Sequence, residues 1–130
     1  MPAVYLDTSA VGRVLLGEPD AGVILAAIGA FDQRVASRLM RVELRRLALR
    51  EGVLADADQL LAGVALVPLD DDLLAVAETL PPSTVATLDA LHLATAVRLA
   101  AAGMLDAVMT YDHRLADGAR QHGLEVLAPA

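Results

Sequence analysis

Four of the seventeen acidic residues stand where the surrounding apolar residues predict burial: Asp7, Glu43, Asp89 and Asp112. Asp7 directly follows the apolar run 3–6, and Asp112 follows the apolar run 107–110. A buried carboxylate without a partner costs on the order of several kcal/mol or takes up a proton. Carboxylates at such positions therefore call for a partner, and a cation is one candidate.

Glu43 lies in a helix predicted over residues 37–50. On a helical wheel it falls between Leu39 and Leu47, inside the apolar stripe of that helix. The simpler alternative is an ion pair with Arg46 at i+3, which contributes only about 0.2–0.5 kcal/mol on an exposed helix. Such a pair does not explain why the acid stands among leucines, so an inward-facing Glu43 is favoured.

Asp89 opens a helix predicted over residues 87–102. On the wheel it lies on the same side as Leu93, Ala96 and Ala100, which is the apolar face. A favourable interaction with the helix dipole in the first turn is the alternative, worth about 0.3–1 kcal/mol. That alternative does not explain the choice of the apolar side.

Asp7 and Asp112 each have an ordinary alternative as the N-cap of the helix that follows. Against it, the carboxyl ends of parallel strands are where ligands bind in open α/β sheets. For each residue taken alone, both interpretations remain open.

The four acids together indicate one cation site at an edge of the sheet. At about 4 Å and an effective dielectric near 20, each like-charged pair costs on the order of 4 kcal/mol. The chain has no Cys and no His at ligand spacing, and oxygen donors alone favour Mg²⁺ or Mn²⁺. A metal-activated water held in such a site is suited to hydrolysis of a phosphodiester bond.

The elements that would position these acids alternate along the chain. Short apolar runs predict strands over residues 3–6, 34–36, 65–67, 107–110 and 125–127. Helix formers fill residues 10–16, 20–30, 37–50, 54–62, 70–80, 87–102 and 114–121. Strands that are apolar throughout and alternate with helices predict an α/β fold, a three-layer α/β/α single domain over residues 1–130 with a short parallel β-sheet.

Composition excludes several classes of function. The absence of Cys excludes zinc fingers, disulfide scaffolds and thiol nucleophiles. All ten basic residues are Arg, which excludes the P-loop and argues against phosphoacceptor receiver domains and aspartyl-phosphate hydrolases, since both look to a lysine. The net charge of −7 argues against a general nucleic-acid coat, but it permits a nuclease whose cations are metal ions.

No apolar run reaches the roughly 18 residues that a membrane-spanning helix needs. The opening residues MPAVYLD lack the basic region of a signal peptide. A cytoplasmic protein with no membrane association is expected.

Four short motifs carry a resemblance to a known family. They are Asp7-Thr8-Ser9-Ala10 after the first strand, Glu43 in Arg-Val-Glu-Leu, the segment LDALHLATA over 88–96, and Thr110-Tyr111-Asp112. In this order and at these separations they resemble the motifs of PIN-domain ribonucleases. The small size looks most like the VapC-type toxins of toxin–antitoxin pairs, and the resemblance covers essentially the whole chain.

The resemblance implies a Mg²⁺-dependent endoribonuclease, with Mn²⁺ as a possible substitute, in which Asp7, Glu43, Asp89 and Asp112 hold the metal. Ser9 and Thr110 would orient carboxylates by hydrogen bonds, and the first and fourth strands would be neighbours. It further implies an RNA substrate, a homodimer, and a cognate antitoxin that wraps the toxin and lays a basic or aromatic side chain over the acidic pocket. A catalytically inactive PIN-like protein that only binds a partner is the alternative.

The remaining charged residues are open to two interpretations. Half of the positive charge lies in one helix, at Arg38, Arg41, Arg45, Arg46 and Arg50. This face could contact phosphates, or it could be a solvated face paired with acids. His92, His113 and His122 show no metal-ligand spacing. His113 could contact substrate but is better explained as a surface residue. Asp117-Gly118 is expected at a solvated helix position.

Overall fold

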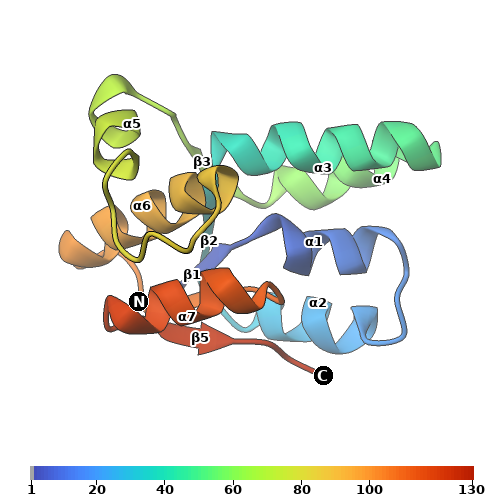
Figure 1. Ribbon diagram of the computed structural model, residues 1–130. Coiled ribbons are helices and arrows are strands. Elements are labelled where there is room, and N and C mark those ends of the chain that lie inside the picture. Colours follow the sequence, from blue (N-terminus) through green and yellow to red (C-terminus); the bar gives the residue numbers. More distant parts are fainter. Residues whose placement is uncertain (1) are drawn as a thin grey trace.

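Residues 2–130 of the computed structural model form five strands and seven helices (Figure 1). The strands are β1 (Ala3–Leu6), β2 (Gln33–Ser37), β3 (Ala65–Val67), β4 (Ala107–Met109) and β5 (Glu125–Leu127). The helices are α1 (Thr8–Leu15), α2 (Ala21–Gly29), α3 (Arg38–Glu51), α4 (Leu54–Ala62), α5 (Asp71–Ala77), α6 (Thr87–Ala101) and α7 (His113–Gln121).

The five strands form one parallel sheet with the order β3-β2-β1-β4-β5. The central strand β1 is buried over its whole length, as expected for a strand covered on both faces. Its neighbour on one side is β4, with Tyr5 opposite Val108. The prediction that the first and fourth strands are adjacent is therefore confirmed.

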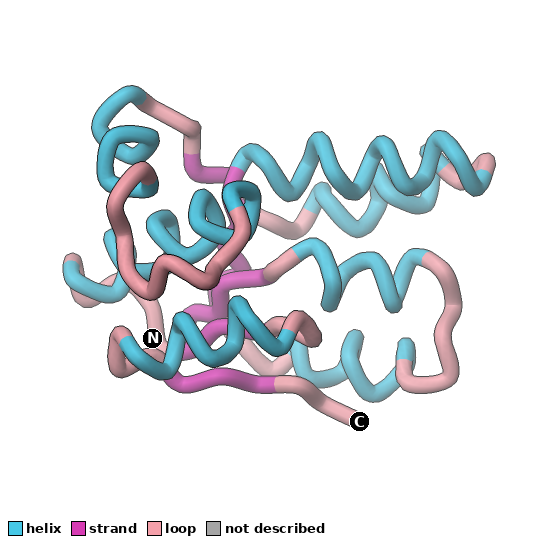
Figure 2. Tube along the Cα trace, in the orientation of Figure 1, coloured by secondary structure: helices cyan, strands magenta, loops and turns pink. Residues whose placement is uncertain are grey.

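Side chains of β1 alternate between two packed layers, because successive residues of a strand point to opposite faces. Val4 and Leu6 belong to a core formed with α1 to α4. Tyr5 packs with Ala96 of α6 and Val108 of β4 on the other face. Figure 1 shows α1 to α4 on one side of the narrow sheet and α5 and α6 on the other, and Figure 2 shows the strands grouped between these layers. The predicted α/β/α arrangement is confirmed.

Element ends differ from the sequence prediction by a few residues. The predicted helix over 70–80 ends earlier, at Ala77, with Glu78 as its C-cap. Asp70 serves as its N-cap, accepting a hydrogen bond from the backbone N–H of Leu73 at 2.8 Å. Thr110, predicted at the end of a strand, lies just beyond β4, where its backbone N–H still donates to the carbonyl of Leu127.

Close packing between α6 and α7 depends on a glycine. Gly118 is buried in α7, which corrects the expectation of a solvated position. A Cβ atom at this position would lie 3.1 Å from Cδ2 of Leu93 and 3.1 Å from Cγ2 of Val85. Leu93 is itself buried, so it has little room to move aside.

We predict that Gly118→Ala lowers the free energy of unfolding by about 1–3 kcal/mol through overpacking at this contact. Urea denaturation followed by circular dichroism measures the change. Gly22→Ala in α2 is the matched control, because Gly22 is exposed and a Cβ atom added there would have no neighbouring atom within 4 Å. The control should be neutral or stabilising by up to about 1 kcal/mol. Equal stability of the two variants would contradict the prediction.

Candidate active site

The register of β1 and β4 brings the first acidic motif beside the last one. Leu6 pairs with Met109, so Asp7 and Thr110 leave the sheet side by side at its carboxyl edge. The backbone N–H of Asp7 donates to the carbonyl of Met109 at 3.1 Å. This edge is where ligands bind in parallel α/β sheets.

Asp7 is only 4% exposed and is held by two hydroxyl groups. Its Oδ2 accepts hydrogen bonds from Ser9 Oγ at 2.7 Å and from Thr110 Oγ1 at 2.8 Å. The same oxygen also accepts from the backbone N–H of Ser9 at 3.4 Å, so Asp7 caps α1 as well. The hydroxyl bonds are much the shorter, and they fix the orientation of this carboxylate.

Glu43 points from α3 toward α1 and α6. Its Oε1 accepts hydrogen bonds from Thr8 Oγ1 and His92 Nε2, both at 2.7 Å. The alternative ion pair with Arg46 is not formed in the part of the chain that the structure describes. Burial raises the pKa of Glu43, but the hydrogen bonds from His92 and Thr8 and the interaction with the charge of His92 together lower it by more, so the pKa lies below its ordinary value. Glu43 is therefore ionised at neutral pH.

Asp89 lies in the first turn of α6, half-buried. Burial, followed by the negative charges of Asp112 and Asp7, raises its pKa from 3.8 to about 6. Glu43 adds a smaller contribution in the same direction. Asp112, Asp7 and Glu43 are therefore near enough to act on Asp89, and a further negative charge is unfavourable where Asp89 stands.

Asp112 is the N-cap of α7, as one of its two interpretations predicted. Its Oδ1 accepts a hydrogen bond from the backbone N–H of Leu115 at 2.8 Å. Its charge nevertheless raises the pKa of Asp89. Asp112 can therefore cap α7 and also belong to the acidic group.

His92 is the residue that sequence reasoning missed. It is 1% exposed, with Nε2 at 2.7 Å from Glu43 Oε1 and Nδ1 at 2.7 Å from the hydroxyl of Tyr5. Burial lowers the pKa of His92, but the Glu43 hydrogen bond and the charges of Asp7, Glu43 and Asp89 raise it by more, so it lies above 6.5. The available signal was its position one helical turn after Asp89.

The donor set fits a hard divalent cation. All four predicted acids offer carboxylate oxygens, and the raised pKa of Asp89 is the effect that a nearby cation would remove. Within residues 2–130, however, no three His, Asp or Glu side chains already have the spacing to hold a metal ion. Joint coordination therefore requires some of these side chains to move.

The arginines of α3 divide between the two interpretations. Arg45 forms an ion pair with Asp58 of α4, and it is the only one of the five cluster arginines paired with an acid among residues 2–130. The others lie exposed or half-exposed on the outer face of the helix. Asp117 is exposed and pairs with Arg120 at 3.4 Å, as expected for a solvated helix position.

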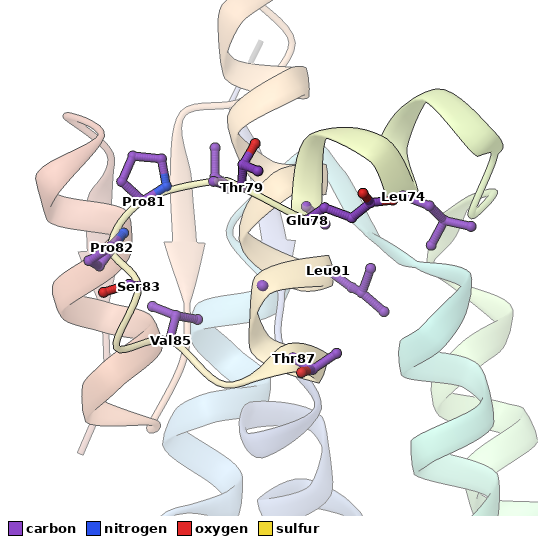
Figure 3. A pocket seen from close by; sticks show the side chains of 12 residues that line it. Leu74, Glu78, Thr79, Pro81, Pro82, Ser83, Val85, Thr87 and Leu91 are labelled. Carbon is purple, nitrogen blue, oxygen red and sulfur yellow. The ribbon is translucent and has the colours of Figure 1, made fainter.

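A separate hollow of about 730 Å³ lies beside α5, the loop over 78–86 and the first turns of α6 (Figure 3). Leu74, Val85 and Leu91 give it a largely apolar lining. Thr87 and Ala90 flank Asp89 in sequence, but none of the four predicted acids lines this hollow. The candidate active site is therefore the acidic group at the sheet edge, and not this hollow.

Two curated relatives match nearly the whole chain. The chain is 36% identical to "Ribonuclease VapC47" of Mycobacterium tuberculosis, over 97% of this chain and 96% of the relative. It is 37% identical to "Ribonuclease VapC46" of the same species, over 100% of both.

Solved structures share the fold at low sequence identity. A chain from a "Toxin-antitoxin complex from Klebsiella pneumoniae" superposes with a TM-score of 0.74 at 19% identity, over 98% of both chains. The sarcin-ricin loop cleaving toxin VapC20 of M. tuberculosis superposes with a TM-score of 0.69 at 18% identity, over 88% of this chain and 93% of that one. The PIN domain family model matches residues 4–121. With its sequence relatives, its fold and the acids at its sheet edge in agreement, the chain belongs to the PIN-domain family.

Proposed function

We propose that this protein is a metal-dependent endoribonuclease that acts as the toxin of a toxin–antitoxin pair. The observation that supports the proposal is that the charges of Asp112, Asp7 and Glu43, which come from separate elements, all raise the pKa of Asp89, with Asp7 at the carboxyl edge of the sheet. Full-length similarity to proteins named as VapC ribonucleases supports the same function.

Asp7, Glu43, Asp89 and Asp112 would hold Mg²⁺, and Mn²⁺ could replace it because both ions prefer oxygen ligands. The bound ion would polarise a water for attack on phosphorus and offset charge on the phosphoryl oxygens. Ser9 and Thr110 keep the Asp7 carboxylate in one orientation through their hydroxyl hydrogen bonds. Thr8 does the same for Glu43.

A cognate antitoxin is the partner we propose, and the similarity to a chain of a toxin–antitoxin complex supports it. Large apolar side chains are exposed on α2 and α3, at Val23, Leu25, Val42 and Leu49. Exposed apolar groups of this kind are suited to cover by another protein. We also propose a homodimer and a cytoplasmic location. Among the helices over residues 2–130, none has the length and apolar character to cross a membrane.

Removing either of two site carboxylates should stop RNA cleavage. We predict that Asp7→Asn and Asp89→Asn each lower the cleavage rate by about 100-fold or more, since each loses a proposed metal ligand. Purified protein freed of antitoxin, incubated with cellular RNA and Mg²⁺, provides the measurement. Asp117→Asn is the matched control, because Asp117 is 72% exposed and outside the site. Cleavage by either site variant at the wild-type rate would overturn the assignment.

Metal removal should have the same effect as these substitutions. Chelation with EDTA should stop cleavage, and added Mg²⁺ or Mn²⁺ should restore it, since four acids need a cation to approach one another. Titration of the metal-free enzyme, followed by RNA cleavage on gels, measures this. A wild-type protein that cleaves no RNA with either ion would refute the proposed function.

Asp89→Asn should also stabilise the metal-free protein. The folded-state pKa of Asp89, about 6, lies above its ordinary value of 3.8, so the ionised group opposes folding. The variant should melt at a higher temperature than the wild type above pH 6, and the difference should fade as the pH falls to about 4. Thermal melts in EDTA across this range measure it. A variant that melts below the wild type at pH 8 would contradict the prediction.

A further inference from the structure

We propose that His92 is a positioning residue for Glu43 and that Tyr5 fixes the imidazole in the tautomer that this role needs. The inference rests on the proposed function, since Glu43 matters for catalysis only if the acidic group binds a catalytic metal. It adds two buried residues, neither of them a carboxylate, to the working site.

The imidazole of His92 joins the core of the protein to the acidic group. One of its ring nitrogens, Nδ1, lies 2.7 Å from the hydroxyl of Tyr5 on β1. The other, Nε2, lies 2.7 Å from Oε1 of Glu43 on α3. His92 and Tyr5 are 1% and 0% exposed, so the contact between them is shielded from solvent, whereas the Glu43 side chain at the other contact is 27% exposed.

The neighbouring groups decide where the protons lie. The backbone N–H of Ser37 donates to the Tyr5 hydroxyl oxygen at 3.3 Å, and an N–H group can only donate. The Tyr5 hydroxyl can still donate, and Nδ1 of His92 lies at 2.7 Å, in position to accept its proton. A neutral ring with Nδ1 as acceptor carries its own proton on Nε2.

The acids on the other side of the ring require the same arrangement. Nε2 faces Glu43 Oε1 at 2.7 Å and Asp7 Oδ1 at 3.6 Å. An unprotonated Nε2 would set its lone pair against carboxylate oxygens, whereas a protonated Nε2 donates to Glu43. The acids therefore place a proton on Nε2, and the Tyr5 hydroxyl is a donor that suits an unprotonated Nδ1.

Hydrogen bonds hold the Glu43 carboxylate through one of its two oxygens and leave the other for a cation. His92 and Thr8 both donate to Oε1 of Glu43. Among residues 2–130, no hydrogen bond involves Oε2 of Glu43, so this oxygen is available to a cation. A group that orients a metal ligand in this way affects metal affinity without touching the metal.

Nitrogen-15 NMR of the metal-free wild-type protein tests the proton placement directly. We expect the Nε2 resonance of His92 to have the shift of a protonated nitrogen. We expect the Nδ1 resonance to have the shift of an unprotonated nitrogen, and a proton on Nδ1, in a neutral or in a doubly protonated ring, would overturn the tautomer that the inference requires. This measurement needs neither RNA nor a variant that has to fold.

A pair of substitutions at His92 tests its effect on the metal. His92→Gln can place an amide N–H near the position of Nε2, whereas His92→Leu fills similar space and donates nothing. We expect His92→Leu to weaken Mg²⁺ binding by about 10–100-fold, measured by calorimetry, and His92→Gln to recover most of that loss. His122→Leu is the control and should leave Mg²⁺ affinity unchanged, since the His122 side chain makes its hydrogen bond to the carbonyl of Pro81, away from the four acids.

A merely structural role for His92 would give a different pattern. In that case His92→Leu, an apolar residue in a buried position, would bind Mg²⁺ as tightly as the wild type, and this result would overturn the inference. Tyr5→Phe provides a second variant: it keeps the packed ring, loses the hydroxyl, and should weaken Mg²⁺ binding in the same direction. Wild-type Mg²⁺ affinity in Tyr5→Phe would exclude the tautomer role of Tyr5.

Failure of this inference can be told from failure of the proposed function. If the wild type binds Mg²⁺ but cleaves no RNA, the ribonuclease proposal fails and the NMR and affinity results still decide the role of His92. If the wild type cleaves RNA and His92→Leu binds Mg²⁺ normally, the ribonuclease proposal stands and the positioning role fails.

Discussion

Repulsion among carboxylates at one edge of the sheet is the constraint on which the site depends. Arginines lie elsewhere in the chain, and the groups that touch these acids are hydroxyls, backbone N–H groups and one imidazole. Hydrogen bonds satisfy individual oxygens, but they do not neutralise the charge of the group. The consequence is visible at Asp89, where burial and the neighbouring acids raise the pKa to about 6. A group of carboxylates of this kind attracts a cation.

The parallel sheet makes this concentration of charge possible. Because β1 and β4 are paired in parallel, Asp7 and Thr110 emerge at the same edge although 103 residues separate them in sequence. The helices that follow begin there too, which brings Thr8 of α1 within reach of Glu43 of α3 and Ser9 within reach of Asp7, the N-cap of its own helix. A helix N-terminus also favours negative charge, and this offsets part of the repulsion at Asp7, Asp89 and Asp112.

The sequence allowed the layers, the parallel sheet and the inward direction of Glu43 to be predicted, because each depends on apolar periodicity. Pairing of β1 with β4 was expected only through the family resemblance. The role of His92 could not be derived, since it depends on α6 packing against Tyr5 and on α3 approaching from the other side. Gly118 was misplaced for a similar reason, as its burial follows from how closely α7 meets Leu93.

Strand β1 explains why the acidic group and the core are linked through one residue. Tyr5 and Asp7 are two positions apart, and side chains two residues apart on a strand point to the same face of the sheet. A helix packed on that face can therefore reach both with one side chain, and His92 of α6 lies against the Tyr5 hydroxyl with Nε2 at 3.6 Å from Asp7. The same ring reaches Glu43. Movement of α6 against the sheet would thus be transmitted to the carboxylates, so the rigidity of this packing helps to determine how well the site is ordered for a cation.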